Sequence, residues 1–144
     1  MAINFTNNWK SILDKLEYEF KQEFKGALPI LKGNKAPAGS TYLEIKPVSS
    51  ELLEYSSSSE TREFAIDIVY YFLDANIKGG AQDHILRVVS RIEALVHNNM
   101  IMTLADNTKA FNCRLASTQL DAENDEEIYV VSWDFKCMHT GNIT

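Results

Sequence analysis

The stretch from Glu60 to Asp74, ETREFAIDIVYYFLD, constrains the fold more than any other part of this chain. Its residues alternate, and side chains of a strand alternate between the two faces of a sheet. One parity is wholly apolar, whereas the other sets apolar residues around Asp67. We therefore expect a central strand with one face in the core. The other face is too apolar for open water and too polar for a deep interior, which indicates a subunit contact.

The length and composition predict one domain over residues 1–144. A chain of 144 residues with 45% hydrophobic and 24% charged residues can bury a single core of ordinary size. Its net charge of −6 and its lack of clustered Lys and Arg argue against specific nucleic-acid binding. The N-terminal residues lack a signal-peptide pattern, and no run of eighteen apolar residues occurs, so we expect no export and no membrane partner.

Two amphipathic helices are expected. The first covers Thr6 to Lys25, with Thr6 or Asn7 as N-cap and Gly26 as the stop. The second begins near Gly79-Gly80 and ends near His97. Apolar residues recur at three- and four-residue steps in both. The two predicted buried stripes are Trp9, Ile12, Leu13, Leu16, Phe20 and Phe24 in the first helix, and Ile85, Leu86, Val88, Val89, Ile92, Leu95 and Val96 in the second.

The remaining segments predict strands and loops. Ile30 lies in a short run next to Pro29 that could pair only at a sheet edge. Residues 41–46 alternate with either Leu43 and Ile45 or Tyr42 and Glu44 inward, and Pro47 is expected to end their pairing. Residues 48–55 form a short strand or a helical turn before the serines at 56–59. The last predicted strands are Met100–Leu104, Lys109–Leu120 and Glu127–Met138.

Core-facing parity is predicted for three residues of the middle strand and five of the last. They are Phe111, Cys113 and Leu115, and Tyr129, Val131, Trp133, Phe135 and Cys137. Both cysteines are expected to be free thiols in the core. The order of helix, strands, helix and strands describes an α+β fold: a mainly antiparallel sheet with two amphipathic helices on one face.

No segment carries a catalytic, cofactor or metal motif, so we expect no enzyme, no cofactor and no metal. The serines at 56–59 lack a nucleophile elbow, and Lys78-Gly79-Gly80 lacks the spacing of a phosphate loop. The acidic connector Asp121–Glu127 lacks the ligand spacing of a calcium loop. The three histidines are scattered, and Cys137 with His139 is too little for zinc.

The sequence resembles the tail terminator and tail completion proteins of long-tailed bacteriophages. The resemblance is one of pattern over nearly the whole chain, with no diagnostic residue. It is carried by the long first helix, a Gly/Pro loop at 32–40, and a Ser-rich turn before Arg62-Glu63-Phe64-Ala65-Ile66-Asp67-Ile68. An Arg91-Ile92-Glu93-Ala94-Leu95 helix and a closing acidic hairpin complete it.

The resemblance implies a structural virion protein, located in the tail or neck after assembly in the host cytoplasm. It implies a homohexameric ring that caps the tail tube, meets the neck connector and lets DNA pass through its lumen. We expect the half-apolar strand faces to make the ring contact, through Val69, Tyr71, Leu73, Ile128 and Val130. The alternatives are another neck, head-closure or minor tail protein, a small-molecule-binding α+β domain, or a monomeric regulator.

Overall fold

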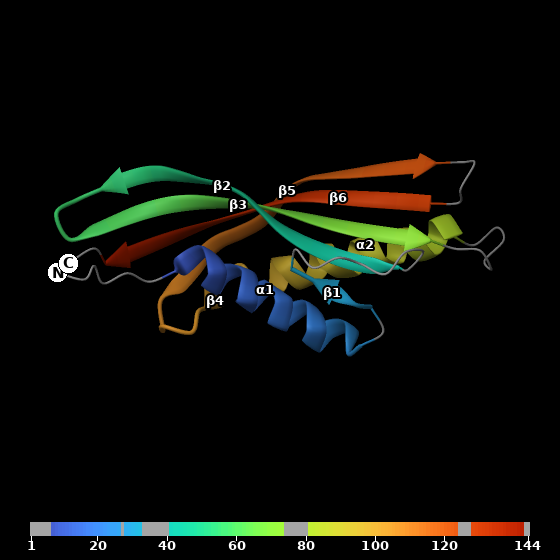
Figure 1. The fold of residues 1–144 in the computed structure, drawn as a ribbon, viewed down its shortest axis with the longest axis horizontal. Coiled ribbons are helices and arrows are strands. Elements are labelled where there is room, and N and C mark those ends of the chain that lie inside the picture. Colours follow the sequence, from blue (N-terminus) through green and yellow to red (C-terminus); the bar gives the residue numbers. More distant parts are fainter. Residues whose placement is uncertain (1–6, 27, 33–40, 74–80, 124–127, 143–144) are drawn as a thin grey trace.

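The described residues fold into two helices and one six-stranded sheet, in agreement with the predicted α+β fold (Figure 1). The computed structural model describes residues 7–26, 28–32, 41–73, 81–123 and 128–142, and of residues 73, 81, 82, 122, 123, 128 and 142 the backbone alone. The elements are α1 (Asn8–Phe24), β1 (Ile30–Leu31), β2 (Tyr42–Tyr55), β3 (Ser59–Leu73), α2 (Ala81–Asn98), β4 (Met102–Thr103), β5 (Lys109–Glu123) and β6 (Ile128–Asn142).

The sheet has the strand order β1-β2-β3-β6-β5-β4, so β3 and β6 are its central strands. Every strand pair is antiparallel except β1 with β2, which is parallel. Both helices lie on the same side of the sheet, below it in Figure 1. This arrangement is the predicted α+β fold, with one face of the sheet covered by helices; we call that face the inner face and the other the outer face.

Helix α1 begins and ends where local chemistry favours it. The Asn7 side chain caps the first turn, because its Oδ1 accepts a hydrogen bond from the Lys10 backbone N–H at 3.1 Å. At the other end Lys25 is left-handed, with φ 49°, and Gly26 follows with φ 85°. The buried stripe is Ile12, Leu16, Phe20 and Phe24, with Trp9 and Leu13 partly buried at its border.

Helix α2 buries a narrower stripe than predicted. Ile85, Ile92 and Val96 are buried, but Leu86 is 48% exposed, so its predicted core position is wrong. One residue along a helix turns the side chain by about 100°. Leu86 therefore lies beyond the stripe that Ile85 and Ile92 define.

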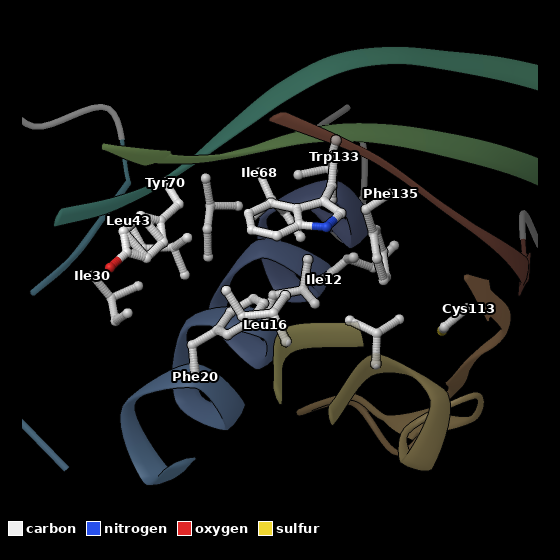
Figure 2. Packing of buried hydrophobic residues seen from close by; sticks show 14 of the residues in the cluster. Ile12, Leu16, Phe20, Ile30, Leu43, Ile68, Tyr70, Cys113, Trp133 and Phe135 are labelled. Atoms are coloured by element: carbon white, nitrogen blue, oxygen red, sulfur yellow. The ribbon is translucent and has the colours of Figure 1, made fainter. Parts of the chain in front are cut away.

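The core lies between the helices and the inner face (Figure 2). Trp133 and Phe135 of β6 and Ile68 of β3 point toward Ile12 and Leu16 of α1. All five side chains are at most 3% exposed. The predicted inward parity of β3 and β6 is therefore confirmed.

The two cysteines are free and buried, as expected. Both belong to the same core cluster as the aromatic residues of β6. The hydrogen bond with the neighbouring Cys113 sulfur, followed by burial, raises the pKa of the Cys137 thiol. The pair therefore behaves as small apolar groups that share a thiol contact.

Strand β2 continues past Pro47, contrary to the prediction that Pro47 ends its pairing. Pro47 aligns with Ile66, and after a register shift Ser49 aligns with Ala65. A bulge lets a strand accommodate proline and resume its ladder. Residues 48–55 are consequently strand and not helical turn, and Leu43 with Ile45, both fully buried, face inward.

A second bulge, in β5, corrects the predicted position of Phe111. Asn112 has φ 54°, and the register shifts between Phe111 and Arg114. Cys113 is buried on the inner face, whereas Phe111 aligns with Met138 and is only half-buried. The left-handed Asn112 therefore interrupts the alternation, so that Phe111 does not share the inner face with Cys113.

Strand β6 is longer than predicted, since it pairs with β3 as far as Asn142. Its added residues put His139 on the inner face at 2% exposure. Three predicted features lie outside the described residues: the loop at 33–40, the Lys78-Gly79-Gly80 helix start, and residues 124–127 of the acidic connector.

Candidate subunit interface

The five predicted contact residues lie together on the outer face of β3 and β6. In the register of these strands Tyr71 is opposite Val130, and Leu73 is opposite Ile128. Val69 lies one row further along, opposite Ser132. Directly opposite residues have Cβ atoms about 4.5–5.5 Å apart, so the register brings the five positions into one patch.

The described part of this patch is less exposed than the sequence suggested. Val69 is 9% exposed, and Tyr71 and Val130 are half-buried. Tyr71 stacks on Tyr42 of β2, with ring centroids 4.6 Å apart. Burial, followed by the neighbouring Tyr71, raises the pKa of Tyr42. The patch is therefore a small apolar strip that Tyr42 already covers in part.

Charged side chains occupy the adjoining part of the outer face. Asp67 lies directly opposite Asp134 in the ladder. Lys136 reaches Asp134 only at 3.9 Å, and Lys46, opposite Asp67, is 2.8 Å from Glu44. Like charges on opposite positions destabilise a sheet. The outer face thus combines an apolar strip with a charged region, and neither helix covers it (Figure 1).

Large exposed apolar residues also lie outside the predicted interface. Four belong to the end of β2 and four lie on or beside α2 and β5. They are Val48, Leu52, Leu53 and Tyr55, and Leu86, Met100, Ile101 and Leu120. The sequence signal was present in Leu52-Leu53-x-Tyr55, because apolar neighbours on both parities cannot all face one core.

A pocket of about 320 Å³ lies on the inner face between the start of α1 and the start of β3. Its charged residues satisfy each other: Arg62 Nε is 3.2 Å from Glu60 Oε1, and Nη1 is 3.3 Å from Ser50 Oγ. Trp9 Nε1 and Asn8 Oδ1 are buried there without a hydrogen-bond partner among the described residues. A small-molecule site needs several polar groups that converge on the ligand, and two unpaired polar atoms are few for this purpose.

His139, at the same end of the sheet, takes part in a structural network. Its Nε2 lies 2.8 Å from Thr108 Oγ1, and that hydroxyl donates to Asp106 Oδ1 at 2.5 Å. Asp106 also accepts from the Thr108 backbone N–H at 3.0 Å. Burial lowers the pKa of His139. The network fixes the β4–β5 turn against β6. The sequence signal for the inward position of His139 was its parity, which it shares with Cys137 and Gly141.

Across residues 7–26, 28–32, 41–73, 81–123 and 128–142, no three His, Cys, Asp or Glu side chains converge as metal ligands would. Neither α1 nor α2 has the length and apolar content to cross a bilayer.

Comparison with known proteins places this architecture among solved structures. No family model and no curated protein matches the sequence. One similar structure belongs to a protein whose name states no function. The two structures have a TM-score of 0.64 and a sequence identity of 13%, and the match covers 94% of this chain and 97% of that chain. Another is a chain from the virion of a native gene transfer agent particle. Here the TM-score is 0.53 and the sequence identity is 9%, and the match covers 91% of this chain and 98% of that chain. These likenesses establish the fold.

Proposed function

We propose that this protein is a structural component of a phage-type virion and acts as a tail terminator. In this role it forms a ring of six copies that caps the tail tube and joins it to the neck connector. It is assembled in the host cytoplasm and remains in the tail or neck. Its contribution is to binding and not to catalysis, so it uses no cofactor and no metal.

The observation that carries the proposal is the fold shared with a virion chain. The likeness spans 91% of this chain and 98% of that chain, so it concerns the whole domain. The sequence resemblance to tail terminators points to the same class of particle. The inner-face pocket, whose charged residues are already paired, favours a structural role over small-molecule binding.

The outer face is the proposed ring contact. The buried Val69 and the half-buried Tyr71 and Val130 form an apolar strip, and the backbone register adds Leu73 and Ile128 to it. The net charge of −6 suits a ring around DNA, since an acidic lumen lets the polymer slide without holding it.

Native mass spectrometry across a concentration series, followed by electron microscopy with cognate tail tubes, tests the proposal. Closed rings at tube ends are expected, and the free protein can be monomeric when dilute because a tube end supplies a template. A protein that stays monomeric alone and on tubes would contradict it. Rings that bind the connector but not the tube would assign the chain to the neck or head-closure proteins.

A further inference from the structure

The two edges of the sheet are largely unpaired within the described residues. At one edge β1 pairs only with Leu43 and Glu44 of β2. At the other edge β4 pairs only with Lys109 and Ala110 of β5. We call Ile45–Tyr55 the β2 edge and Arg114–Glu123 the β5 edge. Each is about ten residues long, and the backbone N–H and C=O groups of its alternate residues point away from the sheet, toward a strand that the described residues do not supply.

Exposed apolar residues accompany these edges. The β2 edge carries Val48, Leu52, Leu53 and Tyr55, the last 71% exposed. Leu120 is exposed on the β5 edge, and Leu86, Met100 and Ile101 are exposed on or directly after α2. A cavity of about 600 Å³ separates α2 from β5 and is lined in part by Met100, Leu115 and Thr118. Apolar surface of this kind marks a protein contact.

The charged residues of the two edges are complementary when the edges lie antiparallel. The β2 edge begins with Lys46 and carries Glu51 and Glu54 toward its end. The β5 edge begins with Arg114 and carries Asp121 toward its end. Strands β2 and β5 run antiparallel within the sheet, because each successive pair from β2 through β3 and β6 to β5 is antiparallel. A second copy in the same orientation, shifted along the strand direction so that the two edges overlap, would set Glu54 near Arg114, and Lys46 near Asp121.

We propose that the β2 edge of one copy pairs antiparallel with the β5 edge of the next copy, so that the sheet continues from subunit to subunit. This inference rests on the proposed ring and names a second contact within it. The two edges are different surfaces on opposite sides of the domain, as a head-to-tail contact requires. A two-fold contact between two β2 edges would leave the β5 edges open.

The bulges in both edge strands fit this arrangement. Strand β2 shifts register after Pro47 and after Leu52, and β5 shifts after Phe111 and after Leu115. Bulges bend a strand and increase its twist. A sheet that continues through identical subunits closes on itself only if it curves, so bent edges favour a ring over a flat filament.

Disulfide trapping tests the contact. Ser49 on the β2 edge and Ser117 and Gln119 on the β5 edge are all exposed on the outer face. The double variants Ser49→Cys/Ser117→Cys and Ser49→Cys/Gln119→Cys sample two registers of an antiparallel pair, whose opposite Cβ atoms lie about 4.5–5.5 Å apart. The matched controls are Ser49→Cys alone and Ser49→Cys/Ser132→Cys, since Ser132 lies on a central strand.

Under mild oxidation at assembling concentrations, at least one double variant is expected to give a ladder of covalent oligomers up to the ring number. The controls give no ladder, and reductant collapses it. Rings without a ladder, or dimers from Ser49→Cys alone, would overturn the edge contact and leave the ring intact. A ladder that grows into filaments absent from tube ends would support the edge contact and contradict the terminator role. If the protein forms neither rings nor a ladder, both the edge contact and the terminator role are overturned.

Discussion

Arg91 of α2 joins the end of α1 through Glu23. Its Nε donates to Glu23 Oε1 at 2.7 Å, and its Nη2 donates to the Glu23 backbone carbonyl at 2.8 Å. The guanidinium also lies 4.7 Å from the centre of the Phe24 ring. The last carbonyls of a helix have no partner within it and carry partial negative charge. One side chain therefore caps α1 and holds the two helices together.

Replacing Arg91 is expected to weaken the fold modestly. Arg91→Ala should lower the free energy of unfolding by about 1 kcal/mol, because the ion pair is half-exposed and the ring contact adds a similar small amount. Arg91→Lys should lose much of this, since lysine lacks the planar fork. The control is Arg87→Ala, which removes only the exposed pair with Asp83. Equal urea midpoints for the two alanine variants would contradict the capping role.

Trp133 is expected to contribute most to the core. Its side chain is 1% exposed and lies above Ile12 in Figure 2. Trp133→Ala should cost about 3–5 kcal/mol in denaturant unfolding. Trp133→Phe should cost less, because it leaves a smaller cavity and removes the Nε1 group, which is buried without a partner. The inward assignment fails if the alanine variant keeps the wild-type midpoint.

His139 predicts a pH dependence near neutrality. Its folded pKa is lowered by burial, whereas an unfolded histidine titrates near about 6.5. Between these two values the unfolded chain binds more protons, so the unfolding free energy falls as pH drops below about 6.5 and is unchanged above it. Asp106, whose pKa is lowered by the Thr108 hydroxyl, loses its contribution only below its usual value of 3.8.

The variant His139→Gln isolates this effect, since an amide can donate to Thr108 without titrating. Urea unfolding is measured at three pH values between about 7.5 and 5.5. The difference in unfolding free energy between wild type and variant should change with pH. Parallel curves would mean that His139 does not titrate in this window.

The opposition of Asp67 and Asp134 predicts a stabilising variant. Asp67→Asn should raise the free energy of unfolding by a few tenths of a kcal/mol, because it removes a like-charge pair on the exposed outer face. The gain should shrink as salt is added. Gln119→Asn is a control on the same face. If Asp67→Asn is destabilising at low salt, the two carboxylates are compensated by groups beyond the ladder.

The outer strip predicts a loss of assembly. Tyr71→Asp combined with Val130→Asp places two charges in the proposed contact and should abolish ring formation in native mass spectra. Tyr18→Asp, on the exposed side of α1, should leave rings intact. Circular dichroism must first show that the double variant folds, since Tyr71 stacks on Tyr42. Rings formed by a folded double variant would remove the strip from the interface.

Periodicity predicted the helices, the inner faces of β3 and β6, and the fold class, because each depends on a regular repeat. It failed where the backbone departs from the repeat. Asn112 shifts the parity of Phe111, and Pro47 bends β2 without ending it. The sequence interpretation also missed the exposure of the β2 edge, although Leu52 and Leu53 signalled it, because the extent of that exposure depends on how far the helices extend below the sheet.

The pairing of β3 with β6 has a consequence for how the protein is made. β3 aligns with β6 along its whole length, from Ser59 opposite Asn142 to Leu73 opposite Ile128. These partners are far apart in sequence, and β6 is synthesised after every other described strand. A nascent chain that has completed α1, β2 and β3 therefore holds an apolar central strand without its neighbour, and long-range pairing of this kind is slow. Chaperone demand during translation should be greatest in that interval.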